Sequence, residues 1–191
     1  MKIVVLEGSP NKNGSTHILA DCFRQGAEGA GHTHRIAQAL HALTGGDWCE
    51  IYPWQPYPMA FPELLEQVRK EIQTGCHPCL LPGAANAGEY EVIFVGSPNW
   101  CGHIAPPLAS WLTKNDLSSK VILPFYSHCG GVPCDFAREI ARLCPRAEVR
   151  EPLGVLEDLG VLGDDGEALW EFLREWLGRN GLPVQPAAYV G

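Results

Sequence analysis

The sequence predicts an α/β protein built on a doubly wound parallel sheet. Short apolar runs such as KIVVLE (residues 2–7) have the composition of strands that are covered on both faces. These runs alternate along the chain with segments whose apolar residues recur at helical spacing. Such alternation is typical of a parallel sheet with helices on both sides.

Composition fits one folded domain. The chain has 191 residues, of which 46% are hydrophobic and 19% charged. A net charge of −8 argues against binding to nucleic acid, which requires a basic face. Because no apolar run approaches the ~18 residues of a membrane span and no signal peptide is evident, we expect a cytoplasmic protein with free cysteines. We expect a single domain over 1–180 and a tail over 181–191.

The first half of the chain contains one ambiguous element. The strand at 2–7 is followed from Ser15 by apolar residues at helical spacing, which predicts a helix. The segment HRIAQALHALTGGDWCEIYP is compatible with a helix followed by a strand at 48–52, or with a strand near 33–37. We favour the strand near 33–37, because a single helix over 15–44 would have to include three glycines, Gly26, Gly29 and Gly31.

The second half of the chain has a clearer pattern. Buried strands are predicted at YEVIFVGSP (90–98), KVILPFYSH (120–128) and AEVREPLGV (147–155). Helices are predicted at APPLASWL, where the prolines suit a first turn, at 134–144, and at 167–178, which has an apolar side. Trp170 and Trp176 belong to that apolar side, whereas Trp54 is expected in a surface loop.

The segment EGSPNKNGST (7–16) is predicted to bind a phosphate. A Gly-, Ser- and Asn-rich loop between a strand and a helix gathers backbone N–H groups and hydroxyls at a helix N-terminus. The segment lacks the Gly-Lys-Ser/Thr of nucleotide hydrolases and the Gly-x-Gly-x-x-Gly of dinucleotide-binding proteins. Its neutral donors suit a terminal phosphate monoester. The alternative is that Ser15 and Thr16 only cap a helix.

Two later loops are expected at the same edge of the sheet. The first rim loop (residues 96–103, GSPNWCGH) and the second rim loop (residues 126–133, YSHCGGVP) each follow a predicted strand. In doubly wound sheets, ligands bind beyond the carboxyl ends of the strands. A flat ring could stack on Trp100 and accept hydrogen bonds from main-chain amides at Gly130 and Gly131. Together with a phosphate site, this arrangement suits FMN.

The same stretches resemble the flavodoxin-like superfamily over most of the chain. KIVVLEGSPNKNGST is similar to the opening of NAD(P)H-dependent FMN reductases, and YEVIFVGSPNWCGHIAPPLASWL to bacterial flavodoxins of the Trp-Trp-Gly type. The resemblance implies a three-layer flavodoxin-like fold with five parallel strands in the order 2-1-3-4-5. It also implies three groups of FMN-binding residues: Ser9, Asn11, Asn13, Gly14, Ser15 and Thr16 at the phosphate; Ser97, Pro98, Asn99, Trp100, Cys101 and Gly102; and Ser127, His128, Cys129 and Gly130.

The sequence departs from that pattern at two positions. The second Trp of the family is Cys101 here, and the family's Thr-His-Gly-Gly is Ser127-His128-Cys129-Gly130. One face of the flavin would then lack an aromatic side chain of this chain. A second subunit in a homodimer, or a substrate, is expected to cover that face.

Three functions remain open at this point. The favoured one is an FMN carrier that transfers electrons between redox partner proteins. The alternative is an NAD(P)H-dependent FMN or quinone oxidoreductase with a small quinone or flavin as acceptor, and the third is a binding domain that has lost its flavin. No catalytic residue is assigned. His128 is a candidate proton relay, or it holds its loop by hydrogen bonding.

No metal site is predicted, and the cysteines give no clear signal. His32 and His34 are two residues apart without an evident third ligand. Cys76 and Cys79 have redox-motif spacing, but they follow a helix rather than begin one, so their redox activity is left open. Cys129 and Cys134 either line the flavin site or pack as small residues, and Cys22 and Cys144 fit a helical core.

Overall fold

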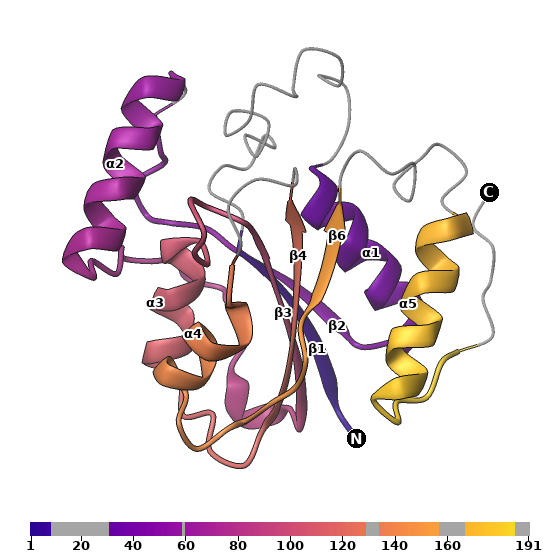
Figure 1. Cartoon of the computed structure of the whole chain (residues 1–191). Helices are drawn as coiled ribbons and strands as arrows, with labels where there is room; N and C mark the ends of the chain where they lie inside the picture. The colour runs from indigo at the N-terminus through magenta and orange to yellow at the C-terminus, as the bar shows by residue number, and fades with distance from the viewer. Residues whose placement is uncertain (9–30, 59, 129–133, 157–166, 186–191) are drawn as a thin grey trace.

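A computed structural model describes residues 1–8, 31–58, 60–128, 134–156 and 167–185 of the chain (Figure 1). Its centre is a parallel sheet with the strand order β2-β1-β3-β4-β5, in which β6 also pairs with β4. The prediction of a doubly wound sheet with the order 2-1-3-4-5 is therefore confirmed. The strands are β1 (Ile3–Gly8), β2 (Asp47–Ile51), β3 (Val92–Pro98), β4 (Val121–His128), β5 (Glu148–Val149) and β6 (Leu153–Leu156).

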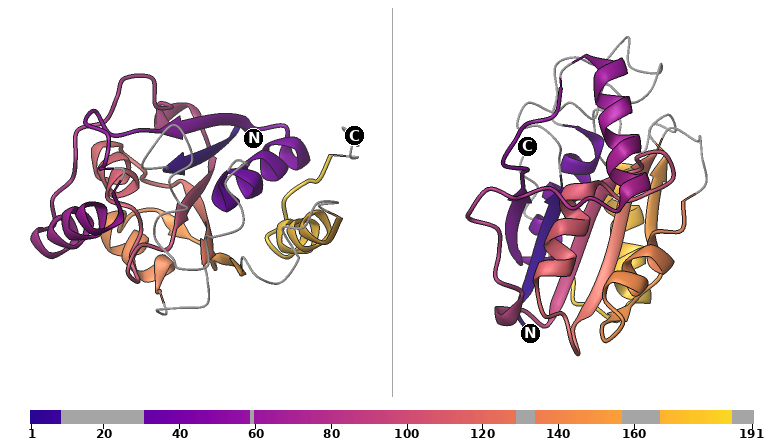
Figure 2. Two further views of the ribbon diagram at one scale, coloured as in Figure 1. Left: turned by 90° about the horizontal axis from the view of Figure 1, so that it is seen from above. Right: turned by 90° about the vertical axis from the view of Figure 1, so that its left-hand side faces the viewer.

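Helices cover both faces of the sheet, as the left view of Figure 2 shows. Side chains of β1 alternate between the two sides: Ile3 and Val5 pack with α1 (His32–Thr44) and α5 (Glu167–Arg179). Val4 and Leu6 point the other way, into a core shared with α3 (Pro106–Lys114) and α4 (Phe136–Leu143). The continuous apolar run at the start of the chain is thus explained by burial on both faces.

The prediction of a strand near 33–37 is wrong. These residues lie in α1, and the second strand is β2, close to the alternative at 48–52. The buried residues Ile36, Leu40 and Leu43 recur every three or four positions, which places them on one face of a helix. Gly45 ends α1 in the left-handed conformation at φ +64°, a conformation that favours glycine. The helix predicted from Ser15 lies outside the described residues.

The last core strand is divided in two. Instead of one strand over 147–155, β5 pairs with the start of β4 at Val121 and Ile122, and β6 pairs with its end from Phe125 to His128. Pro152 lies between β5 and β6 and has no N–H group to donate to β4. The proline therefore explains why the ladder is interrupted there.

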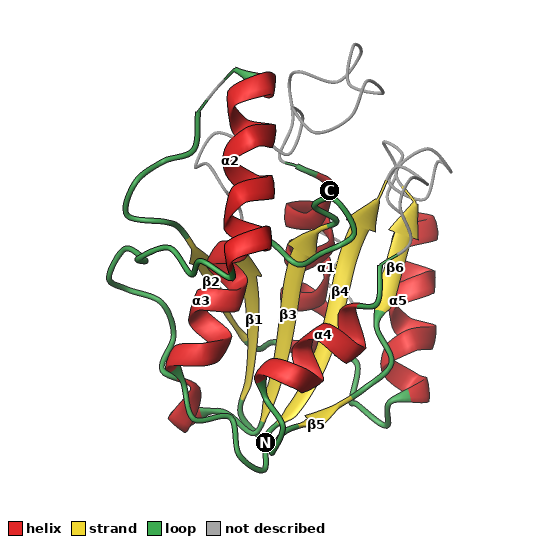
Figure 3. Ribbon diagram, turned by 60° about the vertical axis from the view of Figure 1, so that its left-hand side comes forward, coloured by secondary structure: helices red, strands yellow, loops and turns green. Residues whose placement is uncertain are grey.

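A further helix, α2 (Phe61–Thr74), rises beside the carboxyl ends of the strands (Figure 3). Leu64 and Val68, one turn apart, face a small separate core that also contains Tyr57 and Trp100. A proline in its first turn and the left-handed Gly75 after its last residue mark its two ends. Through Trp100, α2 is packed against the first rim loop.

The tryptophan and cysteine side chains differ in their exposure. Trp54 is 63% exposed and Trp176 is buried, as expected, while Trp170 is partly buried against the core. The six cysteines among the described residues are free, and Cys22 and Cys129 lie outside that part of the chain. No helix in the described ranges is long and apolar enough to cross a membrane.

Gly96 allows β3 and β4 to pack closely. A Cβ atom at this position would lie 2.1 Å from Cζ of Phe125, whose side chain is fully buried. We predict that Gly96→Ala lowers the free energy of unfolding by about 1–3 kcal/mol, because the ring must be displaced in a packed core. Urea denaturation would measure the change.

The matched control for this prediction is Gly178→Ala in α5. An added Cβ has no neighbour within 4 Å there, and alanine favours helices over glycine. This variant should be as stable as the parent or slightly more stable. Equal effects of the two substitutions would contradict the packing explanation.

Candidate functional site

The carboxyl ends of β1, β3 and β4 lie at one edge of the sheet and end at Gly8, Pro98 and His128. Because β1 is flanked by β2 and β3, the strand order reverses beside it, which is where doubly wound sheets bind ligands. The predicted phosphate residues Ser9, Asn11, Asn13, Gly14, Ser15 and Thr16 follow Gly8 directly and lie outside the described residues. Their assignment stays a prediction.

Hydrogen bonds from Ser97 hold the first rim loop in place. The buried Ser97 Oγ donates to the carbonyl of Pro98 at 2.8 Å and accepts from the N–H of Ala105, also at 2.8 Å. Asn99 Oδ1 accepts from the N–H of Gly102 at 2.9 Å. The side chains of two predicted cofactor residues are therefore engaged within the loop itself.

The tip of this loop is a tight turn. Trp100 and His103 exchange two backbone hydrogen bonds of 2.9 Å, and the residues between them, Cys101 and Gly102, have φ angles of +54° and +88°. Two positive φ angles define a type I′ turn. Cys101 is the exposed residue at the tip, and it adopts a left-handed conformation that costs a non-glycine residue about 1–2 kcal/mol.

Trp100 is not exposed at this edge. Its side chain is fully buried and meets the Tyr57 ring edge-on, with ring centroids 5.2 Å apart. Its Nε1 has no hydrogen-bond partner among the described residues. The ring thus presents no open face on which a flavin could stack, and the structure instead places it between the loop and α2.

The second rim loop is joined to the first through Ser127. The N–H of Asn99 donates to the carbonyl of Ser127 at 3.1 Å, and the buried Ser127 hydroxyl pairs with the Thr33 hydroxyl of α1 at 2.8 Å. His128 is half-buried, and its ring lies 5.5 Å from that of Tyr126. Cys129 and Gly130 lie outside the described residues, so their assignment to the cofactor stays a prediction.

A pocket of about 450 Å³ opens next to His128, between β6 and α5. Its walls are mainly apolar, with Val155, Leu156 and Phe172 among them, but α5 adds the carboxylates of Glu171 and Glu175. The pocket has room for a small planar molecule and disfavours an anionic one. It begins at a residue that the sequence assigned to the cofactor.

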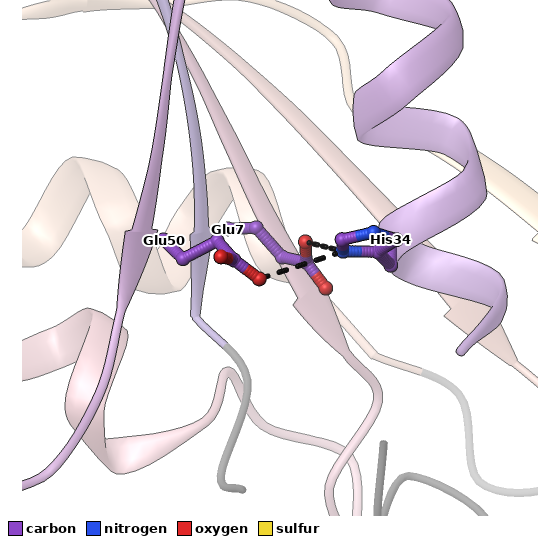
Figure 4. Close-up of side chains that lie close together, drawn as sticks. All are labelled: Glu7, His34 and Glu50. Carbon is purple, nitrogen blue, oxygen red and sulfur yellow. Dashed lines mark hydrogen bonds and ion pairs between the residues drawn. The ribbon is translucent and has the colours of Figure 1, made fainter. Parts of the chain in front are cut away.

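Glu7, His34 and Glu50 form a cluster that was not predicted from the sequence (Figure 4). Glu7 Oε2 lies 2.9 Å from His34 Nδ1, and Glu50 Oε1 lies 3.6 Å from the same nitrogen. Glu7 and Glu50 are register partners on β1 and β2, whereas His34 belongs to the first turn of α1. Glu7 and Glu50 were not recognised as neighbours, because the second strand was predicted near 33–37 instead of at β2.

Burial shifts the proton equilibria of this cluster. The pKa of Glu7 is raised, first because the carboxyl is buried, although the hydrogen bond with His34 acts in the opposite direction. The pKa of His34 is raised mainly by its hydrogen bond with Glu7. The pair therefore retains a proton to higher pH than the separate groups would.

The six cysteines in the described part of the chain form no common cluster. Cys76 and Cys79 are both exposed in the segment after α2, and His77 Nδ1 between them lies 3.2 Å from Thr113 Oγ1. Burial raises the pKa of the Cys144 thiol to about 11, which agrees with an unreactive core residue. The pKa of Cys134, next to Tyr126, is also raised by burial.

The strand order and the loops at the carboxyl edge of the sheet define a flavodoxin-like α/β protein. The family model described as Flavodoxin matches residues 25–157, more than half of the chain, and the chain therefore belongs to the flavodoxin family. The chain has no significant match among curated proteins.

Solved structures with this fold include proteins classed as flavoproteins. One from Bacteroides eggerthii DSM 20697 has a TM-score of 0.70 and 21% identity, covering 95% of this chain and 98% of the other. One from Bacteroides uniformis ATCC 8492 has a TM-score of 0.69 and 16% identity, covering 93% and 97%. A flavoprotein from Lactobacillus acidophilus NCFM, in complex with FMN, has a TM-score of 0.59 and 15% identity, covering 84% and 95%. At these identities the likeness shows the fold.

We predict that Cys101→Gly raises the free energy of unfolding by about 1 kcal/mol, because glycine adopts the left-handed conformation without strain. Chemical denaturation would measure the change. Cys76→Gly is the control, since Cys76 is also exposed but has no positive φ. That variant should be slightly less stable than the parent, because glycine only adds freedom to the unfolded chain. Destabilisation by both substitutions would contradict the explanation.

We also predict that the contribution of Glu7 and His34 to the stability of the chain falls as the pH rises. The ordinary pKa values of Glu7 and His34 are 4.5 and 6.5, and both are raised in the folded chain. Their contribution is therefore fully present below those values and is lost as the pH rises through the folded values. Urea denaturation at a series of pH values would measure this decline.

Glu7→Gln should flatten the decline, because it removes one titrating group and the main cause of the His34 shift. Glu66→Gln, an exposed acid of α2, is the control and should retain the profile of the parent. A Glu7→Gln variant that keeps the parental slope would show that other groups determine it.

Proposed function

We propose that this protein binds FMN at the carboxyl edge of its sheet and transfers electrons between redox partner proteins. The observation that carries the proposal is membership of the flavodoxin family, with a matched segment that includes both rim loops. The structural neighbour in complex with FMN supports the choice of cofactor. The net charge of −8 suits docking against basic partner surfaces.

The described residues fit this cofactor. Hydrogen bonds of Ser97, Asn99 and Ser127 join the first rim loop to the described start of the second and to α1. Cys101 and Gly102 retain solvent exposure at the tip of the first rim loop, so we assign the ring contact to this turn rather than to Trp100. A preorganised site of this kind loses little conformational entropy on binding.

Bound FMN would supply the redox chemistry, since its ring accepts and releases electrons. The chain would hold the phosphate with the neutral donors of residues 9–16 and hold the ring with the two rim loops. His128, half-buried at the end of β4, would be the candidate proton relay of the chain.

The pocket beside His128 favours one alternative, an oxidoreductase with a small neutral acceptor such as a quinone. Val155, Leu156 and Phe172 offer apolar contacts for a planar molecule. The carboxylates of Glu171 and Glu175 would repel the phosphates of NAD(P)H, which makes this pocket a poor site for that reductant. The pocket thus suits the quinone acceptor of this alternative but not its NAD(P)H donor, and we therefore favour the electron carrier over the NAD(P)H-dependent enzyme.

The phosphate assignment can be tested with two ligands. Ser15→Ala combined with Thr16→Ala should lower the affinity for FMN by about 100-fold or more, because each of the two hydroxyls bonded to a charged group contributes about 1.5–3 kcal/mol. The affinity for riboflavin, which lacks the phosphate, should stay the same. Titration calorimetry would give both constants.

Ser118→Ala is the control for this experiment, because it removes a hydroxyl just before β4, at the opposite edge of the sheet. Its affinity for FMN should equal that of the parent. Equal FMN binding by the parent and the double variant would reject the phosphate site. Failure of the parent to bind FMN would favour the flavin-free domain.

Anaerobic mixing with NADH or NADPH distinguishes carrier from reductase. We predict that the FMN-loaded protein keeps its absorbance at flavin wavelengths for many minutes, whereas a reductase would bleach rapidly. A chemical reductant should bleach both. Rapid bleaching by either nicotinamide cofactor would reject the carrier.

A further inference from the structure

The backbone of β1, α1 and β2 sets the positions of Glu7, His34 and Glu50. Glu7 and Glu50 occupy paired positions on adjacent parallel strands, so their side chains leave the same face of the sheet. His34 comes from the first turn of α1, which covers that face (Figure 4). Three potential ligand groups therefore converge from three separate elements.

The distances are close to those around a single bound ion. One ligand atom from each residue lies within 4.8 Å of the other two. Bonds from Zn²⁺ to nitrogen or carboxylate oxygen are about 2.0–2.2 Å long, which separates neighbouring ligand atoms by about 3–4 Å. Since His34 Nδ1 already lies 2.9 Å and 3.6 Å from the two carboxylates, small side-chain rotations would suffice.

The charges of the cluster favour a cation over a simple ion pair. Two carboxylates face one imidazole, and the side chain of Glu7 is only 4% exposed. Even a protonated His34 balances one carboxylate alone, so a net negative charge remains in a cluster that is partly shielded from water. A divalent cation would balance both carboxylates and leave the imidazole neutral.

Two neighbouring residues already orient the ligands. The Tyr52 hydroxyl donates to Glu50 Oε1 at 2.7 Å. The Trp48 ring packs beside the His34 ring, with ring centroids 4.8 Å apart. Such outer partners are typical of metal sites, where they fix the direction of each ligand. Tyr52 is thus a positioning residue, not a ligand.

We propose that Glu7, His34 and Glu50 bind one divalent transition-metal ion of the zinc type. One imidazole with two carboxylates suits Zn²⁺ better than Mg²⁺ or Ca²⁺, which prefer oxygen ligands alone. The side chains of His34 and Glu50 are 21% and 36% exposed, so water can reach the remaining coordination position. This proposal does not rest on the proposed function.

Titration calorimetry with Zn²⁺ tests the proposal. The full chain should carry Cys76→Ser and Cys79→Ser, because these exposed thiols could bind zinc themselves. After treatment with a chelator, we expect this parent to bind one Zn²⁺ per chain, and millimolar Mg²⁺ should not compete. His34→Gln and Glu50→Gln should each weaken zinc binding by more than about 100-fold. Loss of an outer partner weakens metal binding by about 10–100-fold, so a larger loss identifies the two residues as ligands.

Tyr52→Phe separates positioning from folding. It should weaken Zn²⁺ binding by about 10-fold while the melting temperature of the zinc-free chain changes little. Glu66→Gln on α2 is the matched control and should bind as the parent does. If His34→Gln fails to fold, Glu50→Gln and Tyr52→Phe still decide the matter, because both positions are partly exposed.

A crystal structure with Zn²⁺ provides the second measurement. Anomalous density should lie about 2.0–2.2 Å from Nδ1 of His34 and from one oxygen of each glutamate. Absence of stoichiometric binding by the parent would overturn the proposal. Undiminished binding by the His34 and Glu50 variants would also overturn it, as would zinc bound only at other positions in the crystal.

Discussion

The burial of β1 determines where polar chemistry can occur in this protein. All six of its residues are buried, and β2 and β3 pair with its two edges. Within such a strand, a polar side chain needs a partner from a neighbouring element. Glu7, one residue before the end of β1, meets this requirement through His34 of α1.

At the carboxyl edge, neutral polar side chains make the hydrogen bonds that hold the described loop residues. Ser97, Asn99 and Ser127 all direct their oxygens to protein partners, although the family resemblance suggested direct contacts with the cofactor. Glu139 of α4 adds another anchor, because it accepts from the N–H of Ile104 at 3.1 Å. Hydrogen bonds thus hold the first rim loop against β4 and α4.

The sequence predicted those parts of the fold whose signal is local. Apolar runs located β1, β3 and β4 within one or two residues, and helical spacing located α3, α4 and α5. The position of β2 was missed because its residues, DWCEI, are only half-buried at an edge and lack a continuous apolar run. The division into β5 and β6 depends on the pairing of each with β4, which no local pattern reveals.

The candidate site was predicted in part, for a similar reason. Loop composition indicated the carboxyl edge, and β3 and β4 do end there at Pro98 and His128. The burial of Trp100 depends on its contact with Tyr57 and α2, which are distant in sequence. The convergence of Glu7, His34 and Glu50 likewise requires the register between β1 and β2. Contacts across elements, rather than residue types, account for what sequence reasoning could not supply.

The segment after α5 is part of the fold rather than an appendage. The N–H of Gln185 donates to the carbonyl of Leu43 in the last turn of α1, and Leu182 and Val184 pack against the core. The Gln185 amide lies so close to Gly45 that an added Cβ would meet it at 2.2 Å. A truncation after residue 180 would therefore remove the donor to the Leu43 carbonyl and expose apolar surface to water, so residues 181–185 belong to the folded part of the domain.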